Sequence, residues 1–400
     1  MSLGNPVAAE SRSALATPAL SSSLVIFLAI CCGAVVANLY YAQPIIELIA
    51  PSIGLSSASA SLIVSLTQFG YAVGLLFLVP LADLLENRRL LVAFTLAAAL
   101  CLAAAAASST ASLFLVCSLL IGLTSVAVQI LVPLAAHMAP EASRGRVVGN
   151  IMSGLLLGIL LSRPLSSTLA EAFGWRGVFF GAAVLMTLMA LVMGLVLPRR
   201  LPAHRASYPA LIASVFALAR RHAPLRERSL YQGLLFASFS SFWTIAPVEL
   251  VRHYRFSQTE VALFALVGAV GAIAAPIAGR LADAGHGLRS TAAALVLAPL
   301  ALLAGALQGA GWLWMVVTAV ALDFAVQLNM VLGQREVYAL DPHSRARLNA
   351  VYMTSIFVGG ALGSLIASPL YERLGWEMFA CMSALPPLAA LVLFVFRPRA

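Results

Sequence analysis

The chain has 400 residues, of which 62% are hydrophobic and 10% charged, and its mean hydropathy is +0.98. A soluble domain carries about 25% charged and about 45–50% apolar residues, so this composition excludes a soluble, a disordered or a disulfide-scaffold protein. The net charge of +9 comes from arginines in short clusters between apolar runs, as membrane topology requires. We therefore expect a lipid bilayer and no nucleic acid as partner, because a nucleic-acid surface needs a continuous basic face with stacking aromatics.

Twelve apolar runs of about the length that crosses a bilayer follow a polar tail at residues 1–21. The first, from Leu24 to about Ile46, is too long for the apolar core of a signal peptide and reads as a retained span. The others lie near 60–80, 90–107, 113–137, 147–170, 177–197, 230–250, 258–278, 291–307, 312–337, 348–370 and 378–396. The sequence thus predicts an all-α polytopic membrane protein of twelve transmembrane helices.

The runs form two groups of six, separated by the long polar stretch at residues 199–228. We expect six-helix bundles over 22–198 and 229–396, and a second tail at 397–400. Within the stretch, Leu211, Val215 and Leu218 share one face of a helix over 207–221, which favours an amphipathic helix on the membrane surface. A flexible linker is the alternative.

The arginine positions predict the orientation. With the N-terminus in the cytoplasm, 19 of the 24 arginines fall in cytoplasmic segments, and the exceptions are Arg163, Arg176, Arg252, Arg255 and Arg373. Because cytoplasmic loops are enriched in basic residues, both termini are expected in the cytoplasm.

The two halves repeat with an offset of 200 or 201 residues. Residues 81–83 recur at 281–283, residues 143–146 at 344–347, and the Gly174-Trp175 pair at Gly375-Trp376. Each match falls in the same loop of its half. The repeat therefore predicts two pseudo-symmetric bundles in parallel orientation, the layout of major facilitator transporters.

The segment from Val79 to Arg89 resembles the signature loop of the major facilitator superfamily, roughly G-x-L-A-D-x-x-G-R-R/K, and its second copy contains Asp283. In that family the loop aspartate caps a neighbouring helix and pairs with arginine, which latches the halves together in one conformation. The resemblance gives this role to Asp83 with Arg88 or Arg89. A helix cap without a latch is the alternative reading of Asp83.

Two further segments resemble bacterial twelve-span drug:proton antiporters. The first is Asn38 to Pro44 in span one, and the second is the series Gly149, Gly154 and Gly158 in span five, whose small residues let helices approach closely. Span five departs from the family pattern in closing with Arg163-Pro164 instead of Gly-Pro.

The resemblance implies a secondary transporter that exports a small organic or drug-like compound by alternating access. It implies a bacterial inner-membrane monomer driven by the proton gradient, without a cofactor or bound metal. A sugar or metabolite permease of the same fold is the alternative. A non-transporting receptor or a membrane-embedded enzyme is disfavoured, because no nucleophile or buried catalytic cluster is evident in the sequence.

Asp323, near the middle of span ten, is the candidate for proton coupling. A charge at the bilayer centre is costly and needs a purpose, and burial favours the neutral form of a carboxyl, as a reversible proton carrier requires. A structural acid with polar partners is the alternative. Glu47 and Glu249, at the outer ends of spans one and seven, are the next candidates.

Polar and aromatic side chains of several spans are candidates for a substrate cavity. Arg163 is expected to pair with Glu47 or Glu249, to attract an anionic substrate, or to extend to the outer headgroups. Tyr40 and Tyr41 also suit an interfacial aromatic belt. The candidate substrate-binding residues are Asn38, Tyr41, Gln43, Gln129, Arg163, Phe242, Trp243, Gln327 and Asn329.

Overall fold

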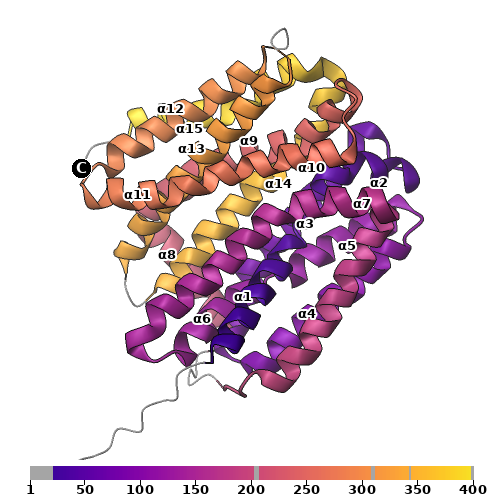
Figure 1. The fold of residues 1–400 in the computed structure, drawn as a ribbon. Coiled ribbons are helices and arrows are strands. Elements are labelled where there is room, and N and C mark those ends of the chain that lie inside the picture. Colours follow the sequence, from indigo (N-terminus) through magenta and orange to yellow (C-terminus); the bar gives the residue numbers. More distant parts are fainter. Residues whose placement is uncertain (1–20, 202–206, 308–310, 342–343, 398–400) are drawn as a thin grey trace, which may run out of the picture.

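Helices form nearly all of the described chain. The computed structural model describes residues 21–201, 207–307, 311–341 and 344–397, so the expected tails at 1–21 and 397–400 lie almost wholly outside it. In Figure 1 the helices of the first half, indigo to magenta, lie beside those of the second half, orange to yellow.

The helical elements follow the predicted order. The first half contains α1 (Ser22–Ala37), α2 (Ile46–Ser52), α3 (Leu62–Phe77), α4 (Asn87–Ala107), α5 (Ala111–Thr124), α6 (Ala127–Met138) and α7 (Arg144–Val196). After the connecting helix α8 (Tyr208–Arg221) come α9 (Ala223–Arg252), α10 (Gln258–Val267), α11 (Ala274–Asp283), α12 (Gly287–Gly305), α13 (Leu313–Leu340), α14 (Arg345–Ser383) and α15 (Leu385–Val395). Short 3-10 helices are η1 (Gln43–Ile45), η2 (Ser57–Ser59), η3 (Val79–Asp83), η4 (Glu141–Ser143) and η5 (Gly268–Ile273).

These elements make twelve spans. Eight helical stretches of the described chain are long and apolar enough to cross a membrane. Two of them, Arg144–Val196 and Arg345–Val395, each hold two spans that meet at a glycine. The shorter helices α1 and α10 belong to two further spans, which continue through η1 and α2 and through η5 and α11. The predicted all-α membrane fold is confirmed.

The backbone carries the internal repeat. Gly174 interrupts α7 at φ 72° and ψ 165°, and Gly375 interrupts α14 at φ 73° and ψ 178°. Glycine is the residue that adopts such positive φ angles without steric cost. The two glycines of the predicted Gly-Trp repeat therefore make the same turn in both halves.

A glycine-to-glycine contact between two helices occurs at equivalent positions of the two halves. A Cβ on Gly158 of α7 would lie 2.2 Å from the carbonyl oxygen of Gly33 in α1, and a Cβ on Gly359 of α14 would lie 2.1 Å from that of Gly233 in α9. The backbones therefore cross in direct contact, as small residues permit. Gly149, which was expected to share this role, has open space around it.

Apolar side chains cover the outside of the bundle, the reverse of a soluble protein. Leu100 is 72% exposed and Leu195 83% exposed. Such a surface is stable only against lipid. The span α9 is instead mostly enclosed by protein, which makes it a central helix.

The predicted amphipathic helix of the linker is α8, but its apolar face is buried against protein and not on the membrane surface, where it was expected. Its Leu211, Val215 and Leu218 are buried, and it packs against α14. The Tyr208 hydroxyl donates a 2.8 Å hydrogen bond to the carbonyl oxygen of Phe77 in α3. The connecting helix therefore touches both halves.

Span one is broken where the sequence predicted a continuous helix from Leu24 to Ile46. The helix α1 ends at Ala37, and a turn leads into η1, which contains Pro44. Proline removes a backbone donor and clashes with the preceding turn of an α-helix. The break replaces α-helix by turn and 3-10 backbone in the middle of the span.

We name the two ends of the bundle by their loops. The arginine-rich end holds residues 84–86, 139–143, 197–201, 207–222 and 284–286, and the opposite end holds residues 53–56 and 253–257. The halves meet along two seams, one between α3 and α14 and one between α7 and α10.

Candidate functional site

Arg163 of α7 points into the protein between the two halves. Its side chain is 5% exposed, and its Nε donates a 2.9 Å hydrogen bond to Oε1 of Gln43. Its guanidinium carbon lies 5.0 Å from the ring centre of Tyr40, 5.8 Å from that of Phe239 and 4.5 Å from that of Trp243. The cation is thus enclosed by aromatic faces, which attract it electrostatically.

Asp323 of α13 contacts the same indole at its N–H edge. It is 6% exposed, and its Oδ1 accepts a 2.8 Å hydrogen bond from Nε1 of Trp243. A Cβ on Gly268 would lie 2.7 Å from Oδ2 of Asp323, and one on Gly271 would lie 2.5 Å from its Cβ. These two glycines of η5 therefore leave room for this carboxyl.

These residues form one site, which we call the central site: Tyr40, Gln43, Arg163, Phe239, Trp243 and Asp323. Arg163 and Asp323 come from opposite halves and act on each other electrostatically. Among the ion pairs of the described residues, however, none joins them directly. The indole of Trp243 contacts both charges, the cation with its face and the acid with its N–H edge.

The central site contains unpaired donors. Nη2 of Arg163 and Nε2 of Gln43 are both buried and have no hydrogen-bond partner in the described structure. Most buried polar groups in native proteins have a partner, and an unpaired one costs about 1–3 kcal/mol. An acceptor in this site would therefore be stabilised.

The other predicted candidates of the first half lie elsewhere. Asn38 donates weak 3.5 Å hydrogen bonds to Ser125 and Met186, inside its own half. Tyr41 lines a separate groove of about 830 Å³ between α1 and α7, whose lining does not include Arg163. Gln129 donates to the hydroxyl of Tyr71 at 3.0 Å, and this ring packs 4.5 Å from Phe357 of the second half.

In the second half, Trp243 belongs to the central site, whereas the preceding residue, Phe242, does not. Phe242 packs 6.1 Å from Trp376, within the second half. Asn329 donates a 2.6 Å hydrogen bond to Gln232, also within the second half, and Gln327 is half-buried. A helix turns its side chains by about 100° per residue, so neighbours in sequence face different partners.

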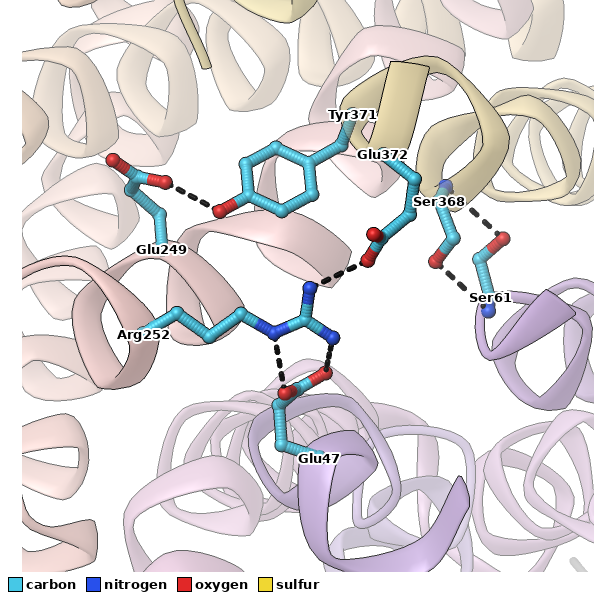
Figure 2. A network of polar contacts seen from close by, with 7 residues as sticks. All are labelled: Glu47, Ser61, Glu249, Arg252, Ser368, Tyr371 and Glu372. Carbon is cyan, nitrogen blue, oxygen red and sulfur yellow. Dashed lines mark hydrogen bonds and ion pairs between the residues drawn. The ribbon is translucent and has the colours of Figure 1, made fainter. Parts of the chain in front are cut away.

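The expected pairing of Arg163 with an outer carboxylate is wrong. Glu47 of α2 instead accepts hydrogen bonds of 2.7 and 2.9 Å from Nε and Nη2 of Arg252, across the two halves. Nη1 of Arg252 donates to Glu372 of α14 at 2.5 Å. Figure 2 shows this arginine between the two acids. We call Glu47, Arg252 and Glu372 the clamp.

Other polar contacts surround the clamp. Glu249 is buried and accepts a 2.6 Å hydrogen bond from the Tyr371 hydroxyl. Ser61 and Ser368 exchange backbone-to-hydroxyl bonds of 3.1 and 3.3 Å across the seam (Figure 2). The halves are therefore held together at the opposite end. The sequence contains one signal for the clamp, because its arginine and its two acids all lie at predicted span ends. Nothing in the sequence indicates that these three residues contact one another.

At the arginine-rich end, the expected pairing of Asp83 with a loop arginine is not formed. Arg88 donates to the carbonyl oxygen of Leu197 at 3.2 Å. Arg89 pairs with Glu86 at 2.8 Å, and Asp83 is exposed. In the second copy of the loop, Asp283 does pair with an arginine, Arg335, at 2.6 Å, inside the second half.

Comparisons with known proteins agree with this architecture. The family model described as Major Facilitator Superfamily matches residues 25–283 and 228–400. The uncharacterized transporter YgaY of Escherichia coli O157:H7 is 42% identical over 89% of this chain and 91% of its own length. A probable transporter of Streptomyces coelicolor is 32% identical over 87% of this chain and 81% of its own.

The fold is also found among solved structures. A bacterial homolog of the human lysosomal transporter Spinster superposes with a TM-score of 0.71, covering 93% of this chain and 94% of its own, at 15% identity. At that identity the likeness concerns the fold alone. Together with the family match and the transporter relatives, it leads to one conclusion. The chain belongs to the major facilitator superfamily, and it is a membrane transporter rather than an enzyme.

Proposed function

We propose that this transporter exports a small organic compound in exchange for protons, with Asp323 as the proton carrier. The observation that carries the proposal is the position of Asp323 in the central site. It is a buried acid bonded to Trp243, and it acts across the boundary between the halves on the cation of Arg163. A carboxyl with no direct ion pair in a protein interior is suited to take up and release a proton.

The two halves give a reason for coupling. Arg163 belongs to the first half and Asp323 to the second, so a rocking motion changes the distance between them. Because a nearby cation favours the ionised carboxyl, the proton affinity of Asp323 would differ between the two conformations. That difference is what a proton gradient needs in order to drive a conformational cycle.

We also propose that the arginine-rich end faces the cytoplasm of a bacterial cell, as the 19 arginines expected there favour. The clamp then closes the outer end of the central site. The signature loop lies at the inner end, where Asp83 is exposed. A protein in this conformation would bind its substrate from the inside, which suits export.

The proposal is tested with the purified protein in liposomes that contain a pH-sensitive dye. The liposomes are loaded in turn with amino acids, organic acids and amphipathic amines, and are then diluted. Efflux of a substrate should acidify the lumen in an antiporter, make it alkaline in a symporter, and leave its pH unchanged in a uniporter.

The variant Asp323→Asn keeps the shape and one hydrogen-bonding oxygen but cannot ionise. We expect its downhill substrate efflux to continue while the pH change disappears. A pH change of wild-type size in Asp323→Asn would refute the assignment and direct attention to Glu47 and Glu249. Alkalinisation by the wild type would instead support a symporting permease.

A further inference from the structure

The unpaired donors of the central site indicate which kind of group it binds. Oε1 of Gln43 accepts from Nε of Arg163, so the two side chains are joined, while Nε2 of Gln43 and Nη2 of Arg163 remain without acceptors. Both free positions are N–H donors. A ligand oxygen that accepts from both would remove two unsatisfied groups at once.

The charge of Arg163 indicates what kind of oxygen this is. Its guanidinium is buried, and no ion pair of the described residues includes it. The rings of Tyr40, Phe239 and Trp243 surround it but supply no negative charge. A carboxylate is the matching acceptor, because its two oxygens fit the fork of a guanidinium.

Asp323 supplies the opposite charge, at the N–H edge of the same indole. One of its oxygens accepts from Trp243, and Arg163 is the charged side chain that acts on it. An ammonium group is the natural partner of such a carboxylate. The rings of Phe239 and Trp243 beside the two charges are the apolar groups on which a short carbon skeleton would pack.

We propose that the central site binds a small organic zwitterion of the amino-acid type. Its carboxylate occupies the free donors of Arg163 and Gln43, its ammonium group approaches Asp323, and its side chain packs on the rings of Phe239 and Trp243. This inference rests on the proposed function in one respect, that Asp323 carries the exchanged proton.

The direction of proton coupling favours a zwitterion over a singly charged compound. Protonation of Asp323 removes a negative charge near the ligand, so a simple anion would bind together with the proton, as in symport. A simple cation would compete with the proton but would face Arg163. The ammonium group of a zwitterion needs the ionised Asp323, so it competes with the proton while its carboxylate neutralises Arg163.

The test is equilibrium binding to the full-length protein in lipid nanodiscs, without any pH gradient. The probes are glycine, leucine, phenylalanine and tryptophan, together with N-acetylphenylalanine, which lacks the cation, and phenylalanine amide, which lacks the anion. The same two derivatives are made for each side chain. We expect at least one amino acid to bind about tenfold to a hundredfold more tightly than both of its derivatives.

Two variants assign the charges. Arg163→Gln should abolish the preference for the amino acid over its amide, and Asp323→Asn should abolish the preference over the N-acetyl derivative. The matched control is Arg176→Gln. Arg176 also belongs to α7 and stacks on a tryptophan, Trp175, at 4.2 Å, but it lies outside the central site. Its variant should keep both preferences.

Binding of either derivative as tightly as its parent amino acid would overturn the inference, and so would the absence of binding by every zwitterion in the panel. The proposed function fails by a different result, a proton flux that survives in Asp323→Asn. If the zwitterions do not bind but Asp323→Asn still uncouples the efflux of another compound, the zwitterion inference is refuted. The proposed exchange of substrate for protons is then supported.

Discussion

The clamp should set the balance between the two conformations of the transporter. Glu47→Gln removes the charge from the one clamp carboxylate that belongs to the first half, while leaving the pair of Arg252 with Glu372 inside the second half. We expect this variant to weaken the contact between the halves at the opposite end and to populate a conformation that is open there.

The magnitude follows from geometry and exposure. The Arg252–Glu47 pair is bidentate, with hydrogen bonds of 2.7 and 2.9 Å, and its side chains are 33% and 19% exposed. A partly solvated bidentate pair stabilises by about 1–2 kcal/mol, less than a fully buried one and more than an average surface pair. The ratio of the two conformations should therefore change by about 5- to 30-fold.

The assay is a spin-label distance measurement between Ser56 of the first half and Arg373 of the second, each replaced by cysteine in a background without the native cysteines. Glu47→Gln should add a longer component to the distance distribution. The matched control is Glu372→Gln, which removes a bond of the same arginine within one half and should cause a smaller change. Equal distributions in wild type and Glu47→Gln would refute the gating role of the clamp.

Three further predictions concern packing, the signature loop and topology. In Gly158→Ala the new methyl group meets the backbone of α1, so the protein should lose about 1–3 kcal/mol of stability and melt at a lower temperature in detergent. Gly149 has open space around it, so Gly149→Ala should leave the melting temperature unchanged. Asp83→Asn should slow substrate turnover in liposomes with little loss of affinity, and normal turnover would make it an ordinary loop residue. Cysteines at Ser207 and Ser56 should react with impermeant reagents from opposite sides of the membrane, and labelling from one side would overturn the topology.

The sequence predicted what depends on composition and local pattern. The apolar runs predicted the spans, and the repeated Gly-Trp pair predicted the equivalent turns at Gly174 and Gly375. The face formed by Leu211 and its neighbours predicted the helix α8, although that face is buried against protein and not on the membrane surface. These features follow from the chain alone, because periodicity and glycine need no knowledge of tertiary contacts.

The partners of the charged residues were harder to predict. Arg163 was placed in the right span, but its contact with Gln43 depends on the break in span one, which the assignment of one unbroken span from Leu24 to Ile46 missed. The clamp joins Glu47 to Arg252, 205 residues away. Such pairs depend on how two bundles meet, and a single sequence does not record this.

The glycine crossings affect how motion passes through the molecule. Within each half, one crossing joins a helix of the central site to a neighbouring helix: α7, which carries Arg163, to α1 in the first half, and α9, which carries Trp243, to α14 in the second. Where backbones touch, no flexible side chain lies between them to absorb a displacement. A ligand that draws Arg163 and Trp243 together would therefore move α1 with α7 and α14 with α9, and the seams between α7 and α10 and between α14 and α3 would shift as well.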